Sequence, residues 1–428
     1  MGGRRRRRLG GDVGCHYLIS GFAGQAAGPA GSGSRRGARD RKHRSVYANG
    51  RPRPGTAAWS LSVFQFSLGR GDKLRIAVLT GGGDCPGLNA AIRAVAQRGW
   101  TMDDEVCGIH YGWSGLTGEG EMHTLSPIEV RDILHESGTM LGTSRTNPGR
   151  SKEDLEEVVR NLRRHAIDGL VAIGGDDTLS VAAKLHEAGV KVVGIPKTID
   201  NDVPGTDFCI GFDTATGVIA DALDRLLSTA KSHARIMVTE VMGRDTGWLA
   251  VVGGLAGGAD FIAIPEVPVH IDYIIEHAAQ HIATHRFSVM AIAEGTQVEG
   301  LEVPKAEVDA SDQFGHVRLA DRGIAQRVAD EIERRTGIDT RVTVLGHLQR
   351  GGTPSVRDRY ISTLMGSAAV DFLHRDILGC MTALKGQEIV PVPLSEIAGK
   401  TWSVPPELYE LGRRFFRTMA ALESPHGT

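Results

Sequence analysis

Residues 192–202 of the chain read VVGIPKTIDND, an apolar run that is followed by a lysine, a threonine and two aspartates. A buried strand that ends in this way brings a cation (Lys197), a hydroxyl (Thr198) and two carboxylates (Asp200 and Asp202) to one place. These groups suit phosphoryl transfer, in which a base accepts a proton and positive charge neutralises phosphate oxygens. A polar turn would also explain the two acids, but it would not require the lysine and the hydroxyl beside them.

Two other segments place polar groups after an apolar run. In the first, 76–90 (IAVLTGGGDCPGLNA), the glycines 81–83 lack Cβ atoms, so their amides can approach a phosphate closely, and a helix over 88–99 adds its N-terminal dipole. An ordinary tight turn is the alternative. In the second, 170–178 (LVAIGGDDT), Asp176 is a candidate Mg²⁺ ligand, because this hard cation prefers carboxylate oxygens. Alternatively, Asp176 or Asp177 is the N-cap of the next helix, a common position for aspartate.

Alternating strands and helices must position these groups. The patterns predict strands at 74–80, 105–110, 169–174, 191–196, 235–242, 261–265, 288–294 and 342–347. They predict helices at 126–137, 151–165, 178–188, 214–231, 271–285, 319–336 and 358–373. This alternation is typical of βαβ units, and the chain has more strands than one sheet would comfortably hold. We therefore expect an α/β protein with two doubly wound, Rossmann-like domains and mostly parallel sheets, whose ligands gather at the carboxyl ends of strands.

The composition is that of a globular protein, with 41% apolar and 23% charged residues. No apolar run approaches the roughly 18 residues of a membrane-spanning helix. Five cysteines are scattered without C-x-x-C spacing, which favours a reducing, cytoplasmic location and argues against a disulfide framework or a zinc site.

The first 70 residues differ from the rest. They hold 14 lysines and arginines and only two acids, which gives a charge of +12. Because the whole chain has a net charge of −2, the remaining residues carry −14. With few periodic apolar residues, we expect residues 1–72 to be a disordered basic extension. It could bind a polyanion or be an organellar transit peptide. We favour the interpretation that translation starts near Leu74 and that the assigned start lies upstream of it. After Met1 the next methionine is Met102, so such a start would use a non-standard initiation codon.

Seven motifs, in order from about Leu74 to about residue 400, together resemble the 6-phosphofructokinase family. They are GGGDCPGLNAAIR, GTSR (142–145), GGDDT, PKTIDND, VMGR (241–244), AIAEG (291–295) and LGHLQRGGTPS (345–355). The resemblance implies a phosphoryl-donor domain of residues 73–211 and 349–399 and a sugar-phosphate domain of 212–348 and 400–428. It implies phosphorylation of fructose 6-phosphate at its 1-hydroxyl, with Mg²⁺, to fructose 1,6-bisphosphate.

The resemblance also implies roles for single residues. Asp200 matches the proton acceptor, and an aspartate with an ordinary pKa near 4 is ionised at neutral pH. Thr198 and Asp202 match residues that orient the hydroxyl, and Asp176 matches the Mg²⁺ position. The remaining matches are Arg145 and Arg244 for phosphoryl oxygens, Gly82 for the donor, Met242, Gly243, Arg244 and Glu294 for the sugar, and His347 and Arg350 for its 6-phosphate.

Arg235 and Arg341 match arginines that the family contributes from a neighbouring subunit. The resemblance therefore implies a homodimer or homotetramer with shared active sites. A solvated surface charge is the alternative for either arginine.

Two residues bear on the phosphoryl donor. ATP-dependent members of the family typically carry glycine where this chain has Asp177, and commonly glycine where it has Lys197. A carboxylate there would repel a nucleotide phosphate by about 4 kcal/mol at 4 Å and an effective dielectric near 20. A lysine can neutralise a compact pyrophosphate. The pair resembles the diphosphate-dependent phosphofructokinases, whose reaction is reversible.

Alternatives remain open at this point. One is an ATP-dependent 6-phosphofructokinase that tolerates Asp177, and another is a catalytically silent regulatory or sugar-phosphate-binding homologue. Retention of Asp200 with its neighbours argues against silence. Arg93 matches one effector-binding position of allosteric bacterial members, but Gln97 replaces a second arginine, so we expect a non-allosteric enzyme. We expect neither a nucleic-acid nor a membrane partner.

Overall fold

The computed structural model describes residues 73–118, 120–301 and 323–414. The expected basic extension, residues 1–72, lies outside the described residues, and so does the beginning of the helix expected at 319–336. All described residues belong to one compact unit, Ser67–Thr428. Among the described helices, none combines the length and the apolar composition that a bilayer crossing requires.

The first sheet has seven strands. Their spatial order is β13 (Glu388–Pro393), β12 (Cys380–Lys385), β5 (Val192–Pro196), β4 (Gly169–Gly174), β1 (Arg75–Thr80), β2 (Glu105–Ile109) and β3 (Met122–Thr124). The five inner strands are parallel, and the edge strands β13 and β3 are antiparallel to their neighbours. The strands β1, β4 and β5, which precede the three motifs, are therefore adjacent and end at the same edge.

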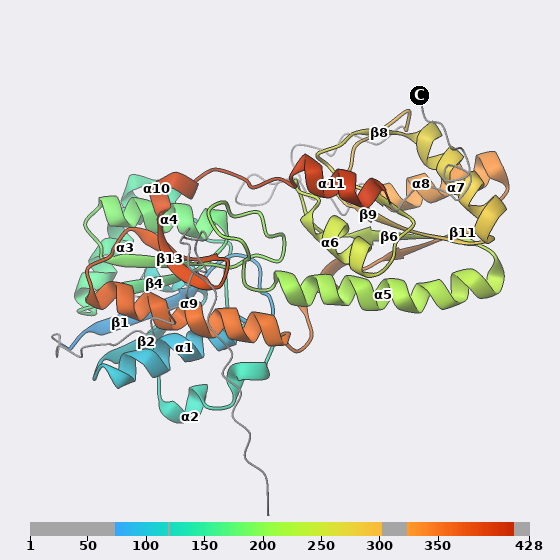
Figure 1. The fold of residues 1–428 in the computed structure, drawn as a ribbon. Helices are drawn as coiled ribbons and strands as arrows, with labels where there is room; N and C mark the ends of the chain where they lie inside the picture. Colours follow the sequence, from blue (N-terminus) through green and yellow to red (C-terminus); the bar gives the residue numbers. More distant parts are fainter. Residues whose placement is uncertain (1–72, 119, 302–322, 415–428) are drawn as a thin grey trace, which may run out of the picture. The chain divides into compact units, whose positions relative to one another are not determined.

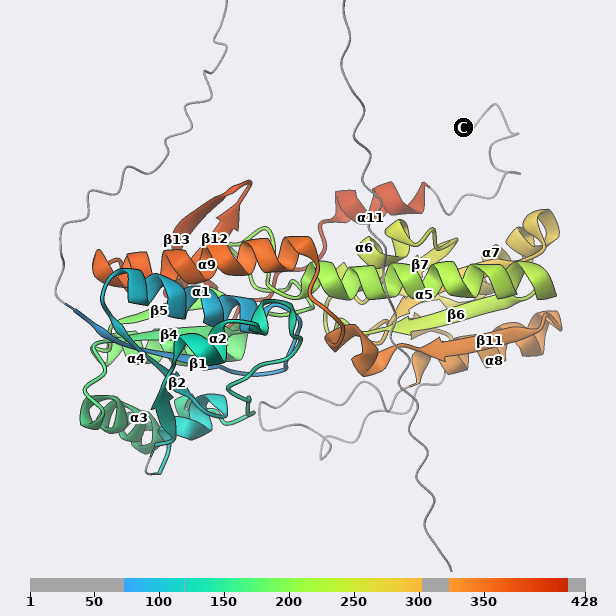
Figure 2. The same cartoon turned by 90° about the horizontal axis from the view of Figure 1, so that it is seen from below.

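Helices cover both faces of this sheet (Figures 1 and 2). Alternate residues of β1 belong to different core clusters, Ile76 and Val78 to one and Ala77 and Leu79 to the other. The first cluster includes side chains of α1 (Leu88–Thr101) and α9 (Val356–His374), which lie side by side in both views. The second includes side chains of α3 (Lys152–Arg164) and α4 (Asp176–Glu187). Burial on both faces explains why β1 is a continuous apolar run.

The second sheet has four parallel strands. Their order is β11 (Thr340–Val344), β6 (Ile236–Val241), β9 (Ser288–Ala293) and β7 (Phe261–Ala263). The core cluster on one face contains residues of α5 (Phe212–His233) and α6 (Trp248–Ala256). The cluster on the other contains residues of α7 (Ile271–His285) and α8 (Ile324–Thr336). The α/β class with mostly parallel sheets is confirmed.

The remaining described elements are short. They are the strand pair β8 (Val269–His270) and β10 (Val298–Glu299), the helices α2 (Pro127–Val130), α10 (Leu394–Ile397) and α11 (Pro406–Arg413), and the 3₁₀ helices η1 (Gly112–Leu116), η2 (Ile133–His135), η3 (Pro148–Arg150) and η6 (Gly346–Arg350).

Two expected elements that lie wholly within the described residues differ from their expected bounds by more than two residues. The helix expected at 126–137 is wrong, because α2 stops at Val130 and a separate 3₁₀ turn follows. Ser126 starts α2 with a capping box, but the apolar residue Ile128 is 82% exposed, so its side chain adds nothing to the buried face. The strand expected at 342–347 begins earlier and ends at Val344, since the chain then enters η6.

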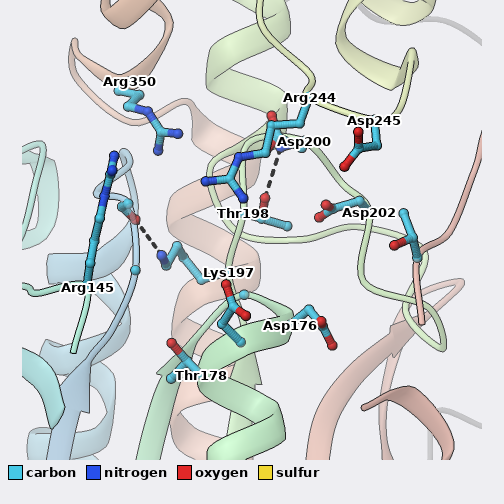
Figure 3. A pocket seen from close by; sticks show the side chains of 15 residues that line it. Arg145, Asp176, Thr178, Lys197, Thr198, Asp200, Asp202, Arg244, Asp245 and Arg350 are labelled. Atoms are coloured by element: carbon cyan, nitrogen blue, oxygen red, sulfur yellow. Dashed lines mark hydrogen bonds between the residues drawn. The ribbon is translucent and has the colours of Figure 1, made fainter. Parts of the chain in front are cut away.

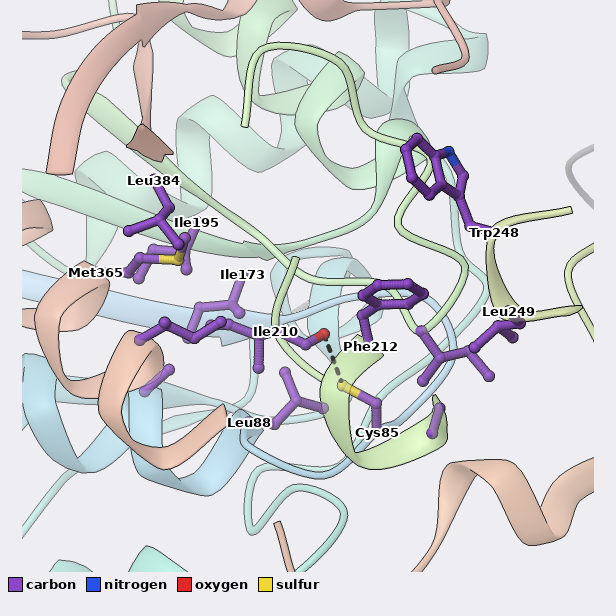
Figure 4. Packing of buried hydrophobic residues seen from close by; sticks show 14 of the residues in the cluster. Cys85, Leu88, Ile173, Ile195, Ile210, Phe212, Trp248, Leu249, Met365 and Leu384 are labelled. Carbon is purple, nitrogen blue, oxygen red and sulfur yellow. Dashed lines mark hydrogen bonds between the residues drawn. The ribbon is translucent and has the colours of Figure 1, made fainter. Parts of the chain in front are cut away.

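An apolar cluster beneath the motif loops links the two sheets (Figure 4). Cys85 of the glycine loop donates its thiol to the carbonyl oxygen of Ile210 at 3.5 Å. Phe212, the first residue of α5, and Leu249 of α6 belong to the same cluster. This packing fixes the glycine loop, the segment after β5 and the start of α6 against one another.

Candidate active site

One pocket collects the carboxyl ends of β1, β4 and β5 with the segment that follows β6 (Figure 3). Its lining residues are Gly82, Gly83, Arg145, Gly175, Asp176, Asp177, Thr178, Lys197, Thr198, Asp200, Asp202, Arg244, Asp245, Arg350 and Thr401. Four of them are cationic and five are aspartates, so the fully ionised pocket has no excess of positive charge.

Lys197 lies beneath the glycine loop. Its side chain is buried, and its ammonium group donates to the carbonyl oxygens of Gly81 at 2.9 Å and Gly83 at 2.5 Å. Burial lowers the pKa of Lys197, and the nearby positive charge of Arg350 lowers it further. The ammonium group is thus held by two of its own N–H bonds to the glycine loop. Lys197 also lines the pocket, where its positive charge can interact with an anion.

The glycines of the loop serve packing more than amide donation. The amides of Gly81 and Gly82 already donate to the carbonyl oxygens of Ile173 and Ser144, so they hold the loop together instead of facing a phosphate. A Cβ at Gly81 would lie 2.5 Å from the hydroxyl oxygen of Thr178. The absence of side chains thus brings neighbouring motifs close to the pocket.

The helix α4 presents its first two residues, Asp176 and Asp177, to the pocket. Neither is the N-cap, because Gly175 occupies that position without a side-chain cap, and the helix begins two residues before the expected Thr178. Acidic residues in the first turn interact favourably with the helix dipole. Asp176 Oδ1 accepts hydrogen bonds from Ser180 Oγ at 3.3 Å and from the Gly399 amide at 3.0 Å.

The loop after β5 carries the acids Asp200 and Asp202. Asp200 is buried, its amide donates to Thr198 Oγ1 at 3.1 Å, and its Oδ1 has no hydrogen-bond partner among the described residues. Burial, and then the charge of Asp200, raise the pKa of Asp202 to about 7. The Asp200 carboxylate therefore favours the protonated form of Asp202, and Asp200 Oδ1 can accept a further hydrogen bond.

The segment after β6 is held by an acid that directly follows β9, the neighbouring strand. The Arg244 amide donates to Glu294 Oε1 at 3.2 Å, and Arg244 adopts a left-handed backbone with φ 50°. Burial raises the pKa of Glu294 to about 7. The Arg244 side chain points into the same space as those of Arg145 and Arg350 (Figure 3).

Arg350 lies across the glycine loop. Its Nη1 donates to the Asp84 carbonyl oxygen at 3.1 Å, and a Cβ at Gly83 would overlap that nitrogen. Arg350 therefore lies next to the glycine loop, whereas His347, expected beside it at the sugar 6-phosphate, is exposed and outside the pocket lining.

Some other expected residues are not in the pocket lining. Met242, Gly243 and Glu294 lie beside it, next to Arg244. Arg235 and Arg341 lie at the amino ends of β6 and β11, where both form salt bridges with Asp339, at 3.0 and 2.6 Å. A strand rises about 3.3 Å per residue, so the length of β6 separates Arg235 from Arg244 and the pocket.

Sequence reasoning did not single out several lining residues. Thr178 is the last residue of the quoted motif GGDDT, and Asp245 directly follows Arg244 of VMGR, so the motifs could have suggested both. Thr401 follows no apolar strand and had no such signal.

Comparisons with known proteins agree on one family. The phosphofructokinase family profile matches residues 75–373. A protein of Dictyoglomus thermophilum named pyrophosphate--fructose 6-phosphate 1-phosphotransferase is 49% identical over 80% of this chain and 99% of its own length. A protein of Chloroflexus aggregans named ATP-dependent 6-phosphofructokinase is 46% identical over 76% and 92%. The crystal structure of a pyrophosphate-dependent phosphofructokinase from Marinobacter aquaeolei is similar in fold, with a TM-score of 0.68 and 24% identity over 81% of this chain and 92% of that one.

Proposed function

The chain belongs to the phosphofructokinase family, and from that premise we propose that it transfers a phosphoryl group from pyrophosphate to the 1-hydroxyl of fructose 6-phosphate. The products are fructose 1,6-bisphosphate and phosphate, and we expect a reversible reaction that serves glycolysis and gluconeogenesis. The observation that carries the choice of donor is that Asp177 and Lys197 line the same pocket as Asp200.

Asp200 is proposed as the general base. Its buried Oδ1, which has no hydrogen-bond partner in the part of the chain that the structure describes, supports this role, because such an oxygen is ready to take the proton of a sugar hydroxyl. Thr198 holds the Asp200 amide, and the raised pKa of Asp202 reduces the negative charge beside Asp200 near neutral pH. Phosphate oxygens that approach Asp200 are then repelled less strongly by the negative charge of this loop.

Lys197, Arg145, Arg244 and Arg350 are proposed to neutralise the donor and the transferring group. Phosphoryl transfer depends mainly on positioning and on charge stabilisation, which preorganised cations supply. Lys197 is preorganised, since two carbonyl oxygens of the glycine loop fix its ammonium group.

The pocket fits a divalent cation that arrives with the diphosphate. Even with Asp202 protonated, its four cations only balance the other four aspartates, so a highly charged anion needs further positive charge to enter. The described residues contain no group of three or more histidines, cysteines, aspartates or glutamates that could hold a metal ion. Mg²⁺ is usually bound by one or two carboxylates together with phosphates and water. Asp176 would hold it, and the ion would supply positive charge that neutralises phosphate oxygens.

Asp177 supports pyrophosphate over ATP. Its carboxylate lines the pocket from the first turn of α4, where a nucleotide would need room for a further phosphate. Repulsion of about 4 kcal/mol at 4 Å would weaken a nucleotide roughly a thousandfold before relaxation. Pyrophosphate has no third phosphate or nucleoside to place beside this acid.

The remaining contacts to the sugar phosphate are proposed to come from a second copy of the chain. Arg235 and Arg341 lie at the edge of the second sheet opposite the pocket, so within one chain they cannot reach it. A homodimer or homotetramer would bring them to a neighbouring site. His347 and Arg350 remain proposed for the 6-phosphate, and Met242, Gly243 and Glu294 for the sugar.

We propose the donor and sugar-phosphate domains with the boundaries predicted from the sequence, since the seven-stranded sheet carries the Lys197 side of the pocket and the four-stranded sheet carries Arg244.

A cytoplasmic location is supported by the cysteines: Cys85, Cys107, Cys209 and Cys380 are free and buried. Control by nucleotide effectors is not expected, because Gln97 stands where a second basic residue would bind phosphate.

A coupled assay tests the proposal. Aldolase and the following dehydrogenase convert fructose 1,6-bisphosphate into an absorbance change, with pyrophosphate and ATP compared at equal Mg²⁺. We expect turnover with pyrophosphate and little or none with ATP. Equal or faster turnover with ATP would overturn the donor and favour the activity that the Chloroflexus relative is named for.

A further inference from the structure

Residues 399–404 form a segment without helix or strand that joins α10 to α11, which we call the strap (Figure 1). The strap follows the last strand of the seven-stranded sheet, and α11 after it packs against α6 and β7 of the four-stranded sheet. It therefore passes from the seven-stranded sheet, on the phosphoryl-donor side of the pocket, to the four-stranded sheet, on the sugar-phosphate (acceptor) side.

On the donor side the strap contacts two of the proposed active-site residues. The Gly399 amide donates to Asp176 Oδ1 at 3.0 Å, and the Trp402 amide donates to the Asp202 carbonyl oxygen at 2.7 Å. Between them, Thr401 lines the pocket itself. Asp176 is the proposed cation ligand and Asp202 belongs to the loop of the base, so the strap holds both by main-chain donors.

On the acceptor side the strap is tied to the start of α6. Trp248 Nε1 donates to the Trp402 carbonyl oxygen at 2.8 Å, and the two indole rings lie 4.5 Å apart. Glu266 Oε1 accepts from the amides of both Val404 and Gly247, each at 3.0 Å. Because α6 begins shortly after Arg244, these bonds couple the strap to the segment that carries this arginine.

We propose that the strap is a positioning element of the active site, which orients the Asp176 carboxylate for a divalent cation and holds the Asp202 loop in register with the start of α6. This inference rests on the proposed function. The physical reason is that a donor to a metal-binding carboxylate fixes its orientation, and loss of such a partner typically costs 10- to 100-fold in metal affinity. An element that only connects two helices would have no effect on a cation.

The glycines of the chain offer a matched pair of variants. Gly399 has φ +68°, and apart from its chain neighbours no atom of the described residues lies within 4 Å of an ideal Cβ. Gly386, in the turn between β12 and β13, has φ +62° and an equally open surrounding, and its amide donates to Asp207 Oδ2 at 2.7 Å. Gly399→Pro and Gly386→Pro each remove an N–H that binds an aspartate and exclude the native φ. Only Gly399 contacts a residue of the pocket.

The readout is cation binding, which needs no turnover. Free Mn²⁺ is measured by electron paramagnetic resonance while Mn²⁺ is titrated into the full chain with methylenediphosphonate, a diphosphate with an uncleavable bridge. We expect Gly399→Pro to weaken Mn²⁺ binding by about 10-fold or more, and Gly386→Pro by less than about twofold. Thermal unfolding of both variants establishes that they are folded.

A second variant covers the case in which Gly399→Pro does not fold. Trp248→Phe keeps an aromatic ring against Trp402 but deletes the indole N–H that binds the strap. We expect it to weaken Mn²⁺ binding by about 2- to 10-fold, the factor of one neutral hydrogen bond. Mn²⁺ affinities equal to wild type in the folded strap variants would overturn the proposal. Wild-type turnover with ATP instead of pyrophosphate would count against the proposed function alone.

Discussion

Replacement of Lys197 by methionine separates catalysis from folding. The change removes the ammonium group and keeps a flexible side chain of similar length. In the structure the ammonium is buried and donates to the carbonyl oxygens of Gly81 and Gly83. The variant therefore alters charge at the pocket and two hydrogen bonds beneath it.

The two effects have different sizes. Gly81 is buried, so its carbonyl oxygen loses a partner at a cost of about 1–3 kcal/mol, whereas Gly83 is exposed and water can replace the lysine there. Relief from burying a charge offsets part of this cost, so we expect stability to fall by no more than about 3 kcal/mol. Loss of a preorganised charge at the transferring phosphoryl group should lower kcat by about 10²- to 10³-fold.

The assay compares kcat with pyrophosphate, KM for fructose 6-phosphate and the free energy of unfolding. We expect a large fall in kcat with KM changed by less than about threefold. A variant with kcat within about fivefold of wild type would refute the placement of Lys197 at the transferring group. A fall in kcat that is fully accounted for by the fraction of unfolded protein under assay conditions would refute it as well. The folded variant would then turn over like the wild type, so the ammonium would contribute to folding alone.

The lowered pKa of Lys197 gives the same experiment a pH dependence. Burial disfavours the ammonium, so activity that needs the charge should decline on the alkaline side before the ordinary lysine pKa near 10.4. Lys197→Arg, which stays charged, should lose that decline. For stability the sign is opposite: the contribution of this group is present above the unfolded pKa and is lost as pH falls through the lowered folded pKa.

Three further outcomes follow from the site. Asp200→Asn should lower the forward rate by at least about 10²-fold while sugar-phosphate binding survives, and near-normal turnover would remove Asp200 from the role of base. Asp177→Gly should raise ATP-supported turnover from its baseline without making it efficient, and an unchanged ratio of ATP to pyrophosphate activity would contradict the proposed block. Mixed oligomers of Arg235→Ala and Asp200→Ala chains should regain activity, and inactive hybrids that demonstrably form would count against a shared site.

Controls for these variants are present in the chain. Asp221→Asn changes an exposed aspartate of α5 whose partner among the described residues is Arg225 in the next turn, so it should leave turnover unchanged. In the mixing experiment, a chain with both Arg235→Ala and Asp200→Ala should fail to rescue the Arg235→Ala chain.

The sequence predicted the strands that carry the site because they are buried on both faces and read as apolar runs. The polar residues that follow β1, β4 and β5 were recognised for the same reason, since polarity begins where the sheet ends. The strap could not be found in this way. Its bonds to Asp176 and Asp202 are made by main-chain amides, which leave no mark on residue type. The amides of Gly81 and Gly82 were assigned to phosphate, but neighbouring carbonyl oxygens take them up in the folded chain.

The glycine loop has a consequence for how such a protein can diverge. The space that a Cβ at Gly81 would need is filled by Thr178, and the corresponding space at Gly83 is filled by Arg350. At Gly211 it is filled by Cys85. Each pair joins motifs that are far apart along the chain. A side chain at Gly81 requires Thr178 to become smaller or to shift, whereas one at Gly83 requires only the guanidinium end of Arg350 to move aside. At Gly211 the backbone φ of +99° adds strain for any side chain. Evolution of a new donor specificity through Gly81 would therefore proceed by paired replacement with Thr178, and among related sequences these two positions should change together.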